Sequence, residues 1–249
     1  MASSWFWLIT LVALSTSAQA NLKDAMVMLD KQYIPALSLV REQSPHASQA
    51  VSRLLDSWWQ FKRQYGYNMP ADLAWNFDMD RLEWLIQSTQ RQVEQDELVA
   101  AYASLLQVRE RFAVIRQRYQ MEYFPDELAR YDLLVESIVI SVRDLANRQL
   151  SEHARMKLLN LTMRAEREWS RLKVTVINPY DYHLQEYQYQ YLQQALESES
   201  RALSELRKAL KQGDDKEIVQ AVKAIQPPLS RGYMVFGDFS ASPRLATHP

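Results

Sequence analysis

The chain has 249 residues, a formal net charge of −1 and no cysteine. Near-neutral charge gives no electrostatic reason to expect nucleic acid or anionic lipid as a partner. The absence of cysteine excludes disulfides, thiolate metal sites and covalent c-type haem attachment. Only four glycines, with abundant Leu, Ala, Gln, Glu and Arg, predict helix nearly throughout.

Residues 1–20 are typical of an export signal. The stretch from Trp5 to Leu14 is apolar except for Thr10, and an Ala-Gln-Ala cleavage motif ends at Ala20. The apolar run is well short of the roughly 20 residues that a membrane-spanning helix needs. We therefore expect cleavage before Asn21, a periplasmic location, and no membrane span in the mature protein. A cysteine-free exported chain also favours a bacterial envelope.

Apolar residues recur at alternating spacings of three and four through most of the remaining chain. Strand-like alternation is nowhere sustained, so the sequence predicts an all-α fold of eight helices. We call each of these apolar stripes a seam. The seams run through Leu22–Val40, Ala47–Tyr65, Leu82–Val93, Leu98–Tyr119, Leu128–Leu145 and Leu192–Leu210, the last broken only by Glu199.

Short polar connections separate these helices and predict a series of antiparallel αα-hairpins. They lie at Ser44–His46, Gln95–Glu97, Asn147–Ser151 and Gly213–Asp215. Four hairpins predict two tandem four-helix bundles, over residues 21–122 and 125–239, followed by a flexible tail at 240–249. A solenoid-like stack of hairpins is the alternative arrangement. Ala50, Leu54 and Phe61 recur as Ala101, Leu105 and Phe112, which suggests a repeated hairpin.

Glycine and proline predict local breaks. Gly213 suits a helix C-terminus that needs a positive φ, and Asp214 can cap the helix after it. Pro35 lies inside the first seam, where it predicts either a simple kink or a bend that opens the bundle to a ligand. Pro227 and Pro228 predict the end of the eighth helix and a restart as a short segment.

The segment from Ala20 to Met26 (ANLKDAM) resembles the start of the periplasmic b-type four-helix-bundle cytochromes, a likeness that extends loosely over residues 20–66. The resemblance implies a four-helix bundle, a periplasmic location and, at Met26, an axial haem ligand. The family's second ligand is a histidine near the end of its fourth helix. Residues 98–120 contain no histidine, so the resemblance indicates a haem-free relative.

The residues that bind metals or catalyse reactions form no recognisable motif. Glu-x-x-His and His-x-x-x-His are absent, and no glycine-rich phosphate loop occurs. We therefore expect no enzyme activity and no cofactor. Met26, His183 and Glu186 are the weak candidates for a metal site. A periplasmic copper, iron or haem carrier of the four-helix-bundle cytochrome type is the alternative function.

Aromatic residues outside the seams are the better functional indication, because monomers rarely leave several large aromatics in water. Trp59 and Trp84 lie off their seams, which indicates either packing between bundles or docking of a partner. If residues 183–191 are helical, His183, Tyr187 and Tyr191 share a face, with Glu186 one turn from His183. The remaining candidates for partner or ligand contact are Tyr180, Tyr182, Tyr233 and Phe236. The sequence thus predicts a non-enzymatic binding or accessory module for an envelope protein or a small apolar ligand.

Overall fold

The computed structural model describes residues 4–66, 73–143 and 150–240, with side chains from residue 20 onward except that of residue 143. Within these ranges the chain forms eight α-helices and one short 3₁₀ helix, η1 (Pro179–Tyr182), and no strand. The all-α expectation is confirmed. The α-helices are α1 (Ser4–Arg41), α2 (Ala47–Tyr65), α3 (Leu73–Glu94), α4 (Leu98–Arg118), α5 (Phe124–Arg143), α6 (Glu152–Lys173), α7 (Glu186–Gln212) and α8 (Asp215–Met234).

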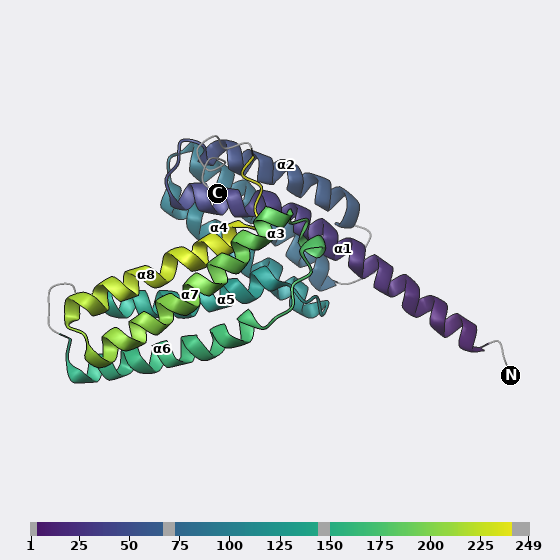
Figure 1. Cartoon of the computed structure of the whole chain (residues 1–249). Coiled ribbons are helices and arrows are strands. Elements are labelled where there is room, and N and C mark those ends of the chain that lie inside the picture. Colours follow the sequence, from purple (N-terminus) through teal and green to yellow (C-terminus); the bar gives the residue numbers. More distant parts are fainter. Residues whose placement is uncertain (1–3, 67–72, 144–149, 241–249) are drawn as a thin grey trace. The chain divides into compact units, whose positions relative to one another are not determined.

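The helices belong to two compact units. Unit 1 comprises the chain up to Glu122 together with the segment that begins at Gly237, and unit 2 comprises Tyr123–Phe236. Within unit 1, α1 contacts α2 and α4, and α3 contacts α2 and α4. Unit 2 repeats this pattern, because α5 contacts α6 and α8, and α7 contacts α6 and α8 (Figure 1). In each unit the four helices therefore enclose one apolar core.

The core of unit 1 includes a buried ion pair. Asp30 on α1 and Arg116 on α4 are both almost fully buried, and Arg116 Nη1 donates to Asp30 Oδ2 over 3.2 Å. The Tyr33 hydroxyl, also on α1, donates to the carbonyl of Leu105 on α4 over 2.8 Å. These polar contacts fix the register of α1 against α4. Apolar contacts alone would let the two helices slide along each other at a small cost in free energy.

The core of unit 2 holds a buried carboxyl group. Glu199 on α7 has no exposed surface, and the Tyr131 hydroxyl on α5 donates to its Oε1 over 2.9 Å. The Tyr131 ring lies 4.7 Å from that of Trp169 on α6, measured between centroids. Trp169 Nε1 in turn donates to the Ser200 hydroxyl and the Leu196 carbonyl of α7. Three helices thus share one layer of aromatic and polar contacts.

Pro35 lies inside α1, where it has no N–H to donate to the carbonyl of Lys31. The segment after α8 supplies the missing donor, since the backbone N–H of Asp238 lies 2.8 Å from that carbonyl. Gly237 makes this approach possible. A Cβ built there would lie 3.0 Å from side-chain atoms of Ile34 and Pro35. The proline therefore provides an attachment point for the C-terminal segment.

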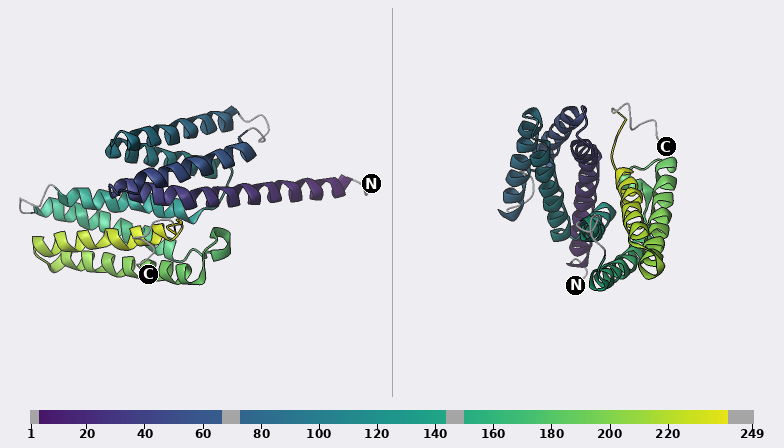
Figure 2. Two further views of the ribbon diagram at one scale, coloured as in Figure 1. Left: turned by 90° about the horizontal axis from the view of Figure 1, so that it is seen from above. Right: turned by 90° about the vertical axis from the view of Figure 1, so that its left-hand side faces the viewer.

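Helix α1 continues without interruption through the expected cleavage point, and its N-terminal part runs beyond the other helices of unit 1 (Figure 2). The first core residue among the described side chains is Leu22, whereas Ala20 and Asn21 are exposed. No helix in the part of the chain that the structure describes is long and apolar enough to cross a membrane.

Two local expectations are wrong. Helix α8 does not end at Pro227 and Pro228 but continues through both to Met234. Its buried seam of Val222, Ile225 and Leu229 outweighs the lost hydrogen bonds. The carbonyls that lose a donor belong to Lys223 and Ala224, which are exposed residues, so water can replace those hydrogen bonds.

Gly213 is the second correction, because its φ of −86° and ψ of 164° are extended and not left-handed. The next helix begins at once, so the chain needs an extended link at this position. Asp214 caps α8 as expected: its side chain accepts from the N–H of Glu217, and Glu217 accepts from the N–H of Asp214.

Candidate functional site: an aromatic strip on unit 1

Three large apolar side chains of α3 are exposed to solvent. Leu73, Phe77 and Trp84 are 83%, 64% and 51% exposed. Their spacings of four and seven residues place them within about 40° of one line along the helix. We call these three residues the α3 strip. Isolated apolar residues on a surface are ordinary, but an aligned set containing two aromatics is typical of a contact surface.

A groove between α3 and α4 borders this strip. Its volume is about 300 Å³. It is lined by Arg81, Leu85, Gln107, Glu110, Arg111 and Val114. Arg81 joins the two features, because its guanidinium lies 4.4 Å from the Trp84 ring centroid while Nη2 lies 3.3 Å from Gln107 Oε1. Strip and groove together offer aromatic surface beside charged and amide groups.

A buried aspartate holds α3 in place. Asp78 is 1% exposed and accepts from two arginines of α4, Arg118 over 2.7 Å and Arg111 over 3.2 Å. Asp78 follows Phe77 directly, so the pairing that buries Asp78 turns Phe77 toward solvent. The pairing with α4 makes Asp78 a fixed support for the strip, and no local sequence pattern encodes that pairing.

The two predicted tryptophans have different environments. Trp84 is exposed and belongs to the strip, whereas Trp59 on α2 is half-buried. Leu73 and Phe77 were not among the predicted site residues. Their helical phase relative to Trp84 was the signal in the sequence that could have found them.

The tyrosine-rich segment of unit 2 does not form the expected single helical face. Tyr182 ends η1, His183 adopts a left-handed conformation with φ of 49°, and α7 begins only at Glu186. His183 therefore does not share a helix with Tyr187 and Tyr191. The Tyr182 hydroxyl accepts from the backbone N–H of Phe124, which ties the end of η1 to the start of α5.

Several residues expected at a docking surface are buried or half-buried instead. Tyr182 and Phe236 lie in the core of unit 2, with their ring centroids 5.2 Å apart. Tyr191 and Tyr233 are half-buried. Only Tyr180 and Tyr187 are mainly exposed. Tyr182 and Phe236 thus fill one end of the core of unit 2. The spacing of apolar residues in the sequence cannot predict this burial.

The weak metal candidates do not assemble into a site. Met26 is buried in the core of unit 1, and His183 and Glu186 are exposed on unit 2, where Glu186 accepts from Gln190. Among the described residues, no three His, Asp or Glu side chains are grouped so that they could hold a metal ion.

Comparison with known proteins gives no relative: the chain matches no family model, no curated protein and no solved structure.

Proposed function

We propose that the protein is an exported, periplasmic binding module that docks an envelope partner through the α3 strip. The exposure of Leu73, Phe77 and Trp84 along one line of α3 carries this proposal. Burying one large apolar side chain contributes roughly 1.5–3 kcal/mol, so three of them supply a large share of the roughly 8 kcal/mol of a micromolar interaction. The adjacent groove, with Arg81 and Arg111, adds polar contacts that select the partner.

A partner protein fits this surface better than a small apolar ligand does. The strip is convex and extends over three turns of a helix, whereas small apolar ligands are enclosed by concave pockets. Trp84 and Arg81 are also the residue types that concentrate binding energy in protein interfaces.

Site-specific photocrosslinking in living cells tests the docking. A photoreactive amino acid in place of Phe77 should give a discrete crosslinked envelope protein, and Trp84→Ala should remove that product. Because Trp84 is half-exposed, its replacement should change the free energy of unfolding by about 1 kcal/mol or less. A matched control is Val99→Ala, which truncates an exposed apolar residue of α4 and should leave the crosslink intact.

Two results would contradict the docking proposal. One is the absence of any product at position 77 that depends on Trp84. The other is destabilisation by about 3 kcal/mol or more in Trp84→Ala, which would make the tryptophan a packing residue. Export is tested separately by mass spectrometry of the periplasmic fraction, in which the chain should begin at Asn21.

A further inference from the structure

A second surface, with different chemistry, lies on α6 of unit 2. Lys157, Arg164 and Arg167 lie along its outer side with Met156 and Met163, and we call these five residues the α6 basic face. All five are exposed, the two methionines by about half. The three cations span about 15 Å of helix and lie within about 80° of arc. They can therefore meet one flat surface together.

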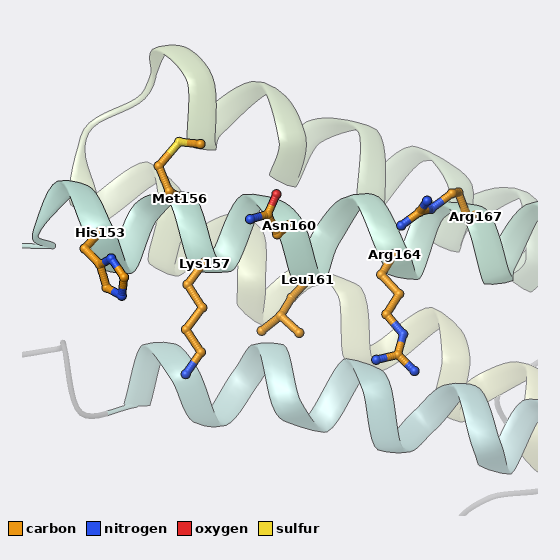
Figure 3. Close-up of a pocket in the computed structure, with 7 residues that line it drawn as sticks. All are labelled: His153, Met156, Lys157, Asn160, Leu161, Arg164 and Arg167. Atoms are coloured by element: carbon orange, nitrogen blue, oxygen red, sulfur yellow. The ribbon is translucent and has the colours of Figure 1, made fainter.

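The basic face surrounds a shallow depression. Lys157 and Arg164 extend to one side of α6 while Met156 and Arg167 extend to the other, with Asn160 between them (Figure 3). The depression has a volume of about 450 Å³. It offers cationic groups on both sides of an uncharged floor, which suits an anionic group.

These cations have no acidic partners. No carboxylate of the described chain lies within 4.0 Å of Lys157, Arg164 or Arg167. The nearby acids on α6 are already paired. Glu166 pairs with Arg207 of α7, and Glu168 pairs with Arg171 one turn along α6. The face therefore keeps three positive charges in a chain whose net charge is only −1.

The composition of the face favours lipid phosphates over a protein partner. Protein interfaces concentrate their energy in buried aromatic anchors, and no Phe, Tyr or Trp lines the depression. Arginine binds phosphate oxygens with two parallel hydrogen bonds, and lysine adds a point charge. Methionines beside the cations are flexible and apolar, so they can enter the boundary between headgroups and acyl chains.

We propose that the α6 basic face binds the surface of a membrane rich in anionic phospholipid. The near-neutral net charge predicted no such partner, because a sum over the whole chain hides a local cluster. The attachment is peripheral and reversible, since three cations give only weak binding. It does not depend on the α3 strip, and it would hold a docked partner beside the membrane.

Co-sedimentation with vesicles tests this proposal on the full mature chain. Vesicles of phosphatidylglycerol and phosphatidylethanolamine should retain the protein at about 10 mM salt and release it near 1 M. Vesicles of phosphatidylethanolamine and phosphatidylcholine should not retain it. Each cation near an anionic surface contributes about fivefold to partitioning, so Lys157→Glu/Arg164→Glu/Arg167→Glu should lower partitioning by at least about 100-fold.

A matched variant distinguishes binding through the α6 basic face from a general effect of the chain's net charge. Arg201→Glu/Lys208→Glu/Lys211→Glu makes the same charge change at three exposed positions of α7 and should keep a larger share of binding. Glutamine at the three α6 positions removes the positive charges without adding negative ones and should also release the protein. Circular dichroism of each variant should show an unchanged helix content, because all six positions are exposed.

Any of four results would overturn the proposal. These are no retention on phosphatidylglycerol at low salt, full retention of the α6 variant, equal loss in the α7 variant, or binding of polyglutamate without binding of vesicles. The last result would assign the face to an acidic protein. Because Trp84→Ala should leave vesicle binding unchanged, failure of the lipid proposal is distinguishable from failure of partner docking.

Discussion

Glu199 shows how one side chain can make a whole unit sensitive to pH. It has no exposed surface, and its Oε2 has no hydrogen-bond partner among the described residues. Burial raises the pKa of Glu199 to about 8; the hydrogen bond from Tyr131 opposes this and the charge of Asp132 adds to it. Burial and the adjacent Glu199 also raise the pKa of Tyr131. The folded protein therefore keeps Glu199 protonated near neutral pH.

The stability of unit 2 should fall as the pH rises from about 4.5 to about 8. In this window the unfolded chain has lost the Glu199 proton while the folded chain keeps it, so folding must bind a proton. The loss should approach 1.4 kcal/mol per pH unit. Glu199→Gln, which still accepts from Tyr131, should remove most of this slope. The pH dependence of stability is measured by urea unfolding, with hydrogen exchange of the α5 and α7 amides as the signal for unit 2. Equal pH dependence in the original protein and in Glu199→Gln would contradict the prediction.

Asp30 and Arg116 should behave as a coupled pair. Arg116→Leu alone leaves a buried carboxylate without this partner and should destabilise unit 1 by about 3–5 kcal/mol. Asp30→Leu/Arg116→Leu should cost clearly less than the single change, because it does not leave a buried carboxylate whose arginine has been removed. A double-mutant cycle measured by urea unfolding checks this. Additive costs would show that the pair does not interact.

At the scale of elements, the sequence predicts where helices form but not which side chains contact neighbouring helices. The seams predicted six of the eight helices, because an apolar stripe must be buried, whichever neighbour buries it. The short polar connections and low glycine content predicted the other two, α6 and α8. The α3 strip was only partly predicted: Trp84 is off its seam, but the exposure of Phe77 depends on Asp78 pairing with α4. The burial of Tyr182 likewise follows from a hydrogen bond to Phe124, which no local pattern encodes.

The attachment between α1 and the C-terminal segment should depend on the absence of a side chain at Gly237. In Gly237→Ala the new methyl group would press on Ile34 and Pro35 and should displace Asp238 from the Lys31 carbonyl. The Asp238 amide should then exchange with solvent much faster, which NMR or mass spectrometry can follow.

Gly232→Ala is the matched control, because a Cβ there meets its neighbours at an ordinary 3.5–3.6 Å. Inside α8 it should stabilise unit 2 by up to about 1 kcal/mol through higher helix propensity. Unchanged exchange at Asp238 in Gly237→Ala would show that the segment can shift without losing its hydrogen bond.

At the scale of the whole molecule, unit 2 is an insertion within unit 1. The chain leaves unit 1 after Glu122 and returns to it at Gly237. The two ends of unit 2 are adjacent, since the ring centroids of Phe124 and Phe236 lie 6.1 Å apart. Domains with neighbouring ends can be inserted into another domain without disturbing its core.

Residues 123–236 should therefore fold as an isolated fragment. We expect a helical circular dichroism spectrum and a cooperative thermal transition, because this range contains all four helices of the unit's core. Trp169 is its only tryptophan and is buried, so its fluorescence should be blue-shifted in the folded fragment. A fragment without a cooperative transition would show that unit 2 depends on unit 1.

The hydrogen bond between Asp238 and Lys31 also sets an order of events during synthesis. Lys31 leaves the ribosome about two hundred residues before Asp238, whose N–H donates to the Lys31 carbonyl. A nascent or truncated chain can form the hairpins of unit 1, but the Lys31 carbonyl accepts the Asp238 N–H only after unit 2 has been made. Proteases that act on incomplete proteins would therefore meet a first helix without this attachment in any product that stops short of Gly237.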